Sequence, residues 1–141
     1  MAKAFTILIA DRNRHIRDLL RREMTGEGYR VRLAKSAGEV LKCIYDSEPV
    51  DLVILDWDMP DARDMALLDR IADRIPTLPV VVHAFAPVRS ERGDNGFNTV
   101  FVEKAANSVD AIKRAVLDLV KGTDPVDTSA QKTPDAFGAE S

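Results

Sequence analysis

Strand-length apolar runs alternate five times with segments of helical spacing, and this alternation restricts the fold more than any other feature of the sequence. Four of the runs are almost continuously apolar, as expected of strands that are buried on both faces of a sheet. The second alternates with a period of two, which indicates a strand nearer an edge. The strands are expected at residues 5–10, 29–33, 51–56, 80–83 and 99–102. Strands and helices in this order predict a parallel sheet that helices cover on both faces.

Start and stop signals divide the segments between these runs into helices. Ser36 and Glu39 have the spacing of a capping box and open the second helix, and Ser108 is expected to cap the last one. The third helix is expected from about residue 62 to 74, in a stretch rich in Ala and Leu. One proline and two glycines in segment 86–98 leave room for only a short or poorly formed helix.

The length of the chain fits one domain, and its single cysteine, Cys43, cannot form an internal disulfide, which agrees with a reducing compartment. Residues 1–121 are expected to form it, whereas residues 122–141 are rich in small and polar side chains and are expected to be a disordered C-terminal tail or a remnant of an expression vector. The net charge of −3 argues against nucleic-acid binding, although arginines lie on the outer face of the first helix. No apolar run reaches the ~20 residues of a membrane span and no signal peptide is recognised, so a cytoplasmic location without membrane contact is expected.

Three of the predicted strands end at a charged residue: Asp11, Asp56 and Lys104. In an open parallel sheet these ends share one edge, where ligands bind near the switch in strand order. Any one of these residues could simply be a charged side chain at a strand end that faces solvent. All three, however, end the most buried strands, where an unpaired charge is costly. Two carboxylates and an ammonium group in one pocket suit phosphoryl chemistry, with a carboxylate as the nucleophile and a divalent cation as the counter-charge.

The same residues carry a resemblance to a known family. Residues from about 5 to 120 resemble the receiver domain of two-component response regulators. The resemblance rests on Asp11 after the first strand, on Asp56 followed by Met59-Pro60 after the third, and on Lys104 after the fifth. It implies an α/β fold of the flavodoxin-like, doubly wound type, with a five-stranded parallel sheet in the strand order 2-1-3-4-5 and helices on both faces.

The resemblance also implies the chemistry. Asp56 would accept a phosphoryl group from a phosphohistidine on a histidine kinase or a histidine phosphotransfer protein, and the chain would be no enzyme beyond this transfer to itself. A magnesium ion would be held by Asp11, Asp56 and the backbone carbonyl of Asp58. Lys104 would contact the phosphoryl group. Phe101 stands at the family's switch-aromatic position, although a core aromatic explains it equally well.

The acidic pocket departs from the family pattern at Arg12. Receivers usually have two adjacent acids after the first strand, and the second is here an arginine, which removes a magnesium ligand and adds a positive charge. If Arg12 points outward, a weaker magnesium site remains; if its guanidinium group enters the pocket, it pairs with Asp56 and replaces part of the cation's charge. Because arginine cannot reproduce octahedral magnesium geometry, the sequence favours weak binding of Mg²⁺.

The fourth strand lacks the hydroxyl side chain that the family places at its end. Counting without a gap from Pro79 puts Ala84 at this position, and a shift of one residue puts His83 there. His83 is interpreted as a phosphoryl donor or metal ligand, or as a partly buried structural histidine, which the sequence favours. With Ala84 at the position, one hydrogen bond between the phosphoryl group and the next loop would be missing.

Three further residues near the pocket are unusual or ambiguous. Asp64 and Ala105 stand where the family commonly has Gly and Pro, and that Pro normally takes part in a cis peptide, so the lysine loop is expected to differ. Trp57 follows the acceptor directly. It is compatible with a ring at the mouth of the site or with a buried packing residue.

Three functions are compatible with this pocket. The leading hypothesis is a stand-alone phosphoacceptor switch that signals through protein contacts with a downstream partner that the sequence does not identify. The alternative is a pseudo-receiver scaffold that binds partners without phosphorylation, which Arg12 and the missing hydroxyl group favour. A metal-dependent phosphatase or hydrolase has the least support, since Asp58 is its one candidate second carboxylate. A homodimer through the last two helices is common in the family, but the irregular segment 86–98 weakens that expectation.

Overall fold

The computed structural model describes residues 5–46, 48–62, 66–73, 78–86 and 99–121. Its elements are β1 (Thr6–Ala10), α1 (Arg14–Gly26), β2 (Arg30–Ala34), α2 (Ala37–Tyr45), β3 (Leu52–Asp56), α3 (Leu67–Ala72), β4 (Val80–Ala84), β5 (Thr99–Glu103) and α4 (Ser108–Lys121). All neighbouring strands are parallel, and the sheet order is β2-β1-β3-β4-β5. The predicted flavodoxin-like topology is confirmed, including the edge position of β2.

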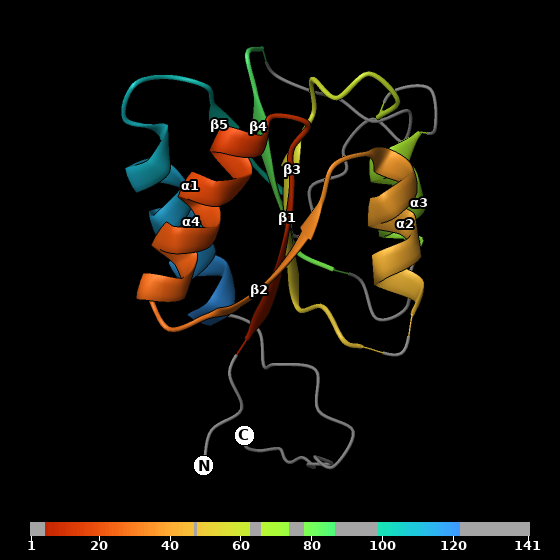
Figure 1. The fold of residues 1–141 in the computed structure, drawn as a ribbon, viewed down its shortest axis with the longest axis horizontal. Coiled ribbons are helices and arrows are strands. Elements are labelled where there is room, and N and C mark those ends of the chain that lie inside the picture. Colours follow the sequence, from red (N-terminus) through yellow and green to blue (C-terminus); the bar gives the residue numbers. More distant parts are fainter. Residues whose placement is uncertain (1–4, 47, 63–65, 74–77, 87–98, 122–141) are drawn as a thin grey trace.

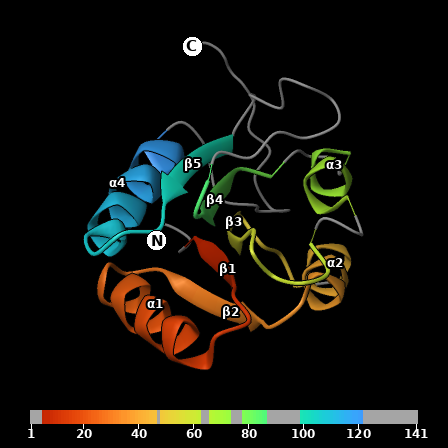
Figure 2. The ribbon, with the colours of Figure 1, turned by 90° about the horizontal axis from the view of Figure 1, so that it is seen from above.

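The helices form two layers, with α1 and α4 on one face of the sheet and α2 and α3 on the other (Figures 1 and 2). Successive side chains of a strand point to opposite faces, so each central strand contributes to both layers. In β3, Ile54 packs with side chains of α1 and α4, whereas Leu55 packs with those of α2 and α3. All five residues of β3 are buried, which explains its continuous apolar run. None of the described helices is long and apolar enough to cross a lipid bilayer.

Two of the helix signals in the sequence are confirmed, at the start of α2 and at the end of α1. Ser36 caps α2, because its hydroxyl oxygen accepts the N–H of Glu39 at 3.2 Å. Gly28, with φ at 96°, takes the left-handed conformation that reverses the chain after α1. The prediction that Ser108 caps α4 is wrong by one residue. Ser108 is already helical, and the carbonyl of Asn107 accepts the first bond of the helix.

Some predictions concern residues that the structure does not describe. These are the form of segment 87–98, the nature of residues 122–141, and the place of Asp64. The predicted third helix is correct in its second half, but residue 62 lies in a turn and α3 begins only at Leu67. Ala66, immediately before it, has a φ of 49° and therefore lies outside the helical region.

Candidate functional site

The site lies at the carboxyl edge of the sheet, where β1, β3 and β4 end beside one another. The register pairs Ala10 with Leu55, so Asp11 and Asp56 follow as neighbours. Asp56 is itself paired with His83. Because paired residues of parallel strands point to the same face, the three polar side chains form a row on the face that α1 and α4 cover. Asp11, Asp56 and His83 are exposed by only 4%, 1% and 7%.

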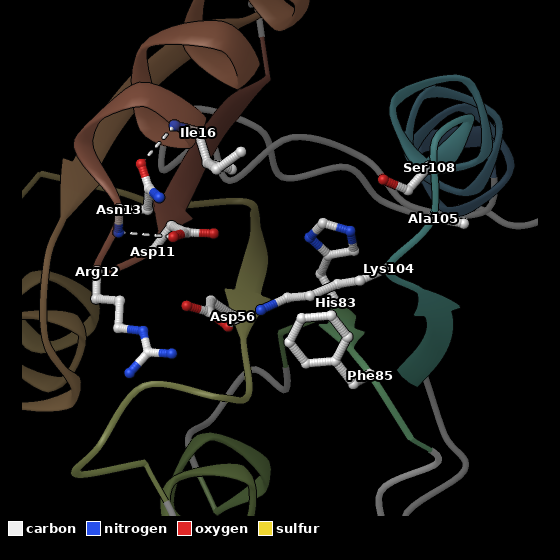
Figure 3. Close-up of a pocket in the computed structure, with 10 residues that line it drawn as sticks. All are labelled: Asp11, Arg12, Asn13, Ile16, Asp56, His83, Phe85, Lys104, Ala105 and Ser108. Carbon is white, nitrogen blue, oxygen red and sulfur yellow. Dashed lines mark hydrogen bonds and ion pairs between the residues drawn. The ribbon is translucent and has the colours of Figure 1, made fainter.

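A pocket of about 460 Å³ lies along this row (Figure 3). The other residues that line it come from the start of α1, from the segments after β4 and β5, and from the start of α4. They are Arg12, Asn13, Ile16, Phe85, Lys104, Ala105 and Ser108. The structure thus brings Asp11, Asp56 and Lys104 into one pocket, as their positions at strand ends indicate.

Lys104 reaches the row from the end of β5. Its backbone N–H donates to the carbonyl of Ala84 at 2.9 Å, which holds the start of its side chain beside β4. Its Nζ lies 2.7 Å from Oδ1 of Asp56 and 2.9 Å from Oδ2 of Asp58. Burial lowers the pKa of Lys104, but hydrogen bonds to these two carboxylates outweigh burial and leave the pKa raised. Lys104 is therefore a fixed positive charge in the pocket.

The loop after β3 holds the Asp56 carboxylate in place. The N–H of Asp58 donates to Oδ1 of Asp56 at 2.9 Å, so this oxygen accepts from both a backbone amide and Lys104. The N–H of Trp57 donates to the carbonyl of His83 at 3.1 Å, which ties the same loop to β4. A carboxylate with this many fixed donors has one orientation, as a nucleophile requires.

The Asp11 carboxyl group has a pKa well above its ordinary value. Burial and the neighbouring charge of Asp56 raise the pKa of Asp11 from 3.8 to about 6, although the N–H of Asn13, at 2.8 Å, and the charge of Lys104 act in the opposite direction. The raised pKa means that Asp11 binds a proton more readily than an exposed aspartate does, and a divalent cation would compete with that proton for the carboxylate.

The raised pKa of Asp11 predicts that the folded state loses stability as the pH rises from about 4 to about 6. In that interval the folded protein holds a proton that the unfolded chain releases, so the free energy of unfolding falls by up to about 3 kcal/mol from this group. Urea denaturation of the wild type and of Asp11→Asn at pH 4 and pH 7, without metal, measures the effect. Asn keeps an oxygen for the N–H of Asn13. A difference between the two proteins that does not change with pH would contradict this account.

The donors available to a divalent cation are the carboxylates of Asp11 and Asp56 and the carbonyl of Asp58. Hard cations such as Mg²⁺ prefer oxygen ligands of this kind, so the residues present fit the ion. The described residues contain no group of three or more His, Cys, Asp or Glu side chains arranged to hold a metal. The site therefore offers a cation two charged carboxylates and one neutral carbonyl, whereas a group of three acids would offer three charged ligands.

Arg12 lines the pocket without pairing with Asp56, so of the two arrangements that the sequence left open, the pairing with Asp56 is not the one observed. It is an exposed side chain, and in Figure 3 it lies on the opposite side of Asp56 from Lys104. No ion pair joins Arg12 to Asp56, two residues that the structure describes. Its charge contributes to the lowered pKa of Asp58. Arg12 therefore stands at the rim of the pocket, where it adds positive potential without replacing the cation.

His83 and Ala84 point to opposite faces of β4. His83 lines the pocket, burial lowers its pKa, and neither ring nitrogen has a hydrogen-bond partner in the described structure. Ala84 is buried in the core cluster under α2 and α3. Neither supplies a hydroxyl group, and the burial of His83 agrees with the structural interpretation that the sequence favours.

Of the three remaining sequence candidates, only Ala105 lines the pocket. Trp57 is buried in the cluster under α2 and α3, so the packing alternative is correct. Phe101 is 38% exposed and pairs in the register with Val82, on the face of the sheet away from the row. Ala105 lines the pocket beside Lys104.

Sequence reasoning missed the Asp58 side chain and Phe85. The resemblance to receivers assigned a role only to the carbonyl of Asp58, yet its carboxylate accepts from Nζ of Lys104 at 2.9 Å and from the N–H of Phe85 at 3.3 Å. These bonds and the charge of Arg12 outweigh burial and leave the pKa of Asp58 lowered. The acid two residues after Asp56 was a visible signal for the first contact. Nothing in the sequence indicated the backbone bond to Phe85.

Comparison with known families gives one family model that matches. It describes the response regulator receiver domain and covers residues 7–91. The DNA-binding transcriptional regulator NtrC of Bradyrhizobium sp. (strain RP501 Parasponia) is 40% identical over 79 residues, which are 56% of this chain and 16% of NtrC. The response regulator MprA of Mycobacterium sp. (strain KMS) is 34% identical over 86 residues, which are 61% of this chain and 37% of MprA. The chain thus spans less than two fifths of these curated relatives.

Solved structures have the same fold over most of the chain. The response regulator protein TrrA from Thermotoga maritima, solved in complex with Mg²⁺-BeF, is 29% identical with a TM-score of 0.70, and the match covers 82% of this chain and 99% of TrrA. A CheY-like receiver domain protein from Methanospirillum hungatei JF-1 is 24% identical with a TM-score of 0.69, covering 84% of this chain and 96% of that one. The second likeness concerns the fold alone.

Proposed function

Because the chain belongs to the response regulator receiver domain family, we propose that Asp56 accepts a phosphoryl group from a phosphohistidine on a histidine kinase or a histidine phosphotransfer protein. The observation that carries the proposal is the Asp56 carboxylate itself. It is 1% exposed, lines an open pocket, and has Nζ of Lys104 at 2.7 Å from its Oδ1. The phosphorylated chain then signals through contacts with a downstream protein, and it turns over no other substrate.

In the proposed transfer, a carboxylate oxygen of Asp56 attacks phosphorus and forms a P–O bond. The P–N bond to the donor imidazole breaks, and its electron pair stays on the imidazole nitrogen. Lys104 offers a positive charge to the phosphoryl oxygens, and the N–H of Asp58 keeps the carboxylate oriented during the attack.

Asp11, Asp56 and the carbonyl of Asp58 are the residues that would hold Mg²⁺. When bound, the cation offsets the negative charge that gathers on the phosphoryl group. The complex of TrrA with Mg²⁺-BeF supports this assignment, since that protein shares the fold and 29% of its sequence with this chain. We propose that Mg²⁺ binds weakly here, because Arg12 brings a positive charge to the pocket instead of a third carboxylate.

Incubation with acetyl phosphate and Mg²⁺ is expected to add one phosphoryl group to the wild type and none to Asp56→Asn. Intact-mass spectrometry measures the adduct. Asp61→Asn serves as the matched control, because Asp61 belongs to the same loop but accepts the N–H of Ala37 instead of lining the pocket. An adduct of equal yield in Asp56→Asn, or none in the wild type at tens of millimolar Mg²⁺, would contradict the proposal.

The second candidate function is a pseudo-receiver that binds partners without phosphorylation. Two observations favour it: Arg12 at the rim of the pocket, and the absence of a hydroxyl side chain at His83 and Ala84, where β4 ends. It predicts no adduct in the experiment above. It also predicts that Asp56→Asn leaves partner binding unchanged, whereas the phosphoacceptor proposal predicts that partner binding responds to acetyl phosphate only in the wild type.

A further inference from the structure

We propose that the carboxylate of Asp58 is a positioning group that joins Lys104 to the backbone of Phe85 in the resting protein, and that phosphorylation of Asp56 breaks this connection. We call the Asp58 carboxylate and its contacts with Lys104 Nζ and the Phe85 N–H the Asp58 bridge. The breaking step rests on the function proposed above, whereas the bridge itself is a property of the unphosphorylated structure.

The Asp58 bridge connects three loops through one side chain. Asp58 follows β3, Phe85 follows β4 and Lys104 follows β5. Oδ2 of Asp58 accepts from Nζ of Lys104 at 2.9 Å and from the N–H of Phe85 at 3.3 Å. The ring of Phe85 also lies over Lys104, with Nζ 4.8 Å from its centroid (Figure 3). Phe85 is thus held to Lys104 twice, once through Asp58 and once by a cation–π contact.

In the resting protein the bridge makes Lys104 a shared group. The ammonium group lies between Oδ1 of Asp56 and Oδ2 of Asp58, at 2.7 and 2.9 Å. Asp58 is only 20% exposed on its side chain, so water screens this contact little. A phosphoryl group on Asp56 would lie beside this same ammonium group, because Nζ contacts the Asp56 carboxylate directly. Asp58 therefore competes with the incoming phosphoryl group for the same positive charge.

Phosphorylation changes the balance of charge around Lys104. A phosphoryl group carries about −1.5 to −2 charges, compared with −1 for the carboxylate that it modifies, and it adds strong acceptor oxygens. Lys104 then binds the phosphoryl oxygens more strongly than it binds Asp58. Once the ammonium group of Lys104 has moved to the phosphoryl oxygens, the Asp58 carboxylate is repelled by the phosphoryl group on Asp56, two residues away. Its movement leaves the N–H of Phe85 without its acceptor.

Because Phe85 directly follows β4, its hydrogen bond to Asp58 can transmit phosphorylation of Asp56 to the segment after this strand. Phe85 follows Ala84, whose methyl group cannot form a hydrogen bond with a phosphoryl group. Among the described residues of β4, His83 is the one polar side chain, and its ring has no hydrogen-bond partner. The backbone bond from Phe85 to Asp58 is therefore a direct polar link through which the pocket reaches the segment after β4. The exposed ring of Phe85, 68% accessible, places the change at the surface.

Hydrogen exchange at the Phe85 amide tests the bridge. The chain has five phenylalanines, so [¹⁵N]phenylalanine labelling gives a sparse NMR spectrum, and Phe85→Leu identifies the signal of interest. In the unphosphorylated state, Asp58→Ala is expected to speed exchange of this amide by about tenfold or more. Asp58→Asn removes the charge but keeps an oxygen, so a smaller increase is expected. Asp61→Asn, the control in the same loop, is expected to have no effect.

The same signal tests the breaking step. Acetyl phosphate with Mg²⁺ is expected to speed exchange of the Phe85 amide in the wild type to the level of Asp58→Ala. Asp58→Asn is expected to gain its adduct several-fold faster, because a second negative charge no longer competes for Lys104. Equal protection in wild type and Asp58→Ala would overturn the bridge. A wild type that gains the adduct by mass but keeps Phe85 protected would overturn the breaking step. No adduct at all would overturn the proposed function and the breaking step with it, while the comparison of unphosphorylated variants still decides on the bridge.

Discussion

Replacement of Lys104 by methionine is expected to lower the free energy of unfolding by about 3 kcal/mol at pH 7, the largest stability effect that the site predicts. Met keeps most of the length of the side chain but removes the ammonium group. Asp56, which is 1% exposed, then loses the cation 2.7 Å away, and Asp58 loses the same partner. The carboxylates of Asp56 and Asp58 then lack their paired cation, Asp11 lies in the same pocket as Asp56, and Arg12 stands only at the rim of that pocket. Urea denaturation measures the loss.

Two comparisons separate this effect from the general loss of an ion pair. Lys113→Met removes a lysine that pairs with Glu23 at 2.6 Å between α4 and α1, where solvent screens the charges, so its effect is expected to be much smaller. Added Mg²⁺ is expected to restore more stability to Lys104→Met than to the wild type, because it neutralises the same carboxylates. If Lys104→Met costs no more than Lys113→Met, then Lys104 does not balance the pocket in the way described.

Replacement of Arg12 by aspartate is expected to tighten Mg²⁺ binding by on the order of tenfold or more. The change removes a positive charge from the rim of the pocket and places a carboxylate beside Asp11, so both electrostatics and the number of oxygen ligands improve. Each factor of ten corresponds to about 1.4 kcal/mol, a modest demand on two charge changes next to a divalent cation. Titration with Mg²⁺, followed by Trp57 fluorescence, measures the affinity.

Two control variants tell the contribution of the charge from that of the ligand. Arg12→Ala removes the positive charge without adding an oxygen, and we expect an affinity between those of the wild type and Arg12→Asp. Arg21→Asp makes the same change of charge on the exposed face of α1, away from the pocket, and we expect it to have little effect. Unchanged Mg²⁺ affinity in Arg12→Asp would show that Arg12 does not weaken the site.

The features that follow from periodicity could be predicted from the sequence. The strand order came from the resemblance to the receiver family, whereas the meeting of Asp11, Asp56 and Lys104 follows from strand ends that share one edge of a parallel sheet. Because Asp11 and Asp56 are neighbours in the register of β1 and β3, the alternation of side chains puts both acids on the same face of the sheet. The family resemblance and the strand pattern predict the same pocket, because the family's motif residues are the ones that end the buried strands.

The features that depend on side-chain conformation in loops could not be predicted. Trp57 follows Asp56 directly, and only the packed core under α2 and α3 decides that its ring is buried. The bond from Phe85 to Asp58 joins two residues 27 positions apart, neither of which lies in a strand or helix. Arg12 has a long, exposed side chain with several rotamers available, so the sequence alone does not fix its place at the rim of the pocket. The segment 87–98 lies outside the described residues, so its predicted irregularity stays a prediction.

The central claim is that Asp56 itself carries the phosphoryl group, and locating the group tests it most directly. Borohydride reduces an acyl phosphate but not a free carboxylate, so an aspartyl phosphate becomes homoserine while other aspartates are unchanged. After treatment with acetyl phosphate and Mg²⁺, reduction and proteolysis, peptide mass spectrometry is expected to find homoserine at position 56 and at no other aspartate. Homoserine at Asp11 or Asp58, or no homoserine in a protein that gained the phosphoryl mass, would contradict the account.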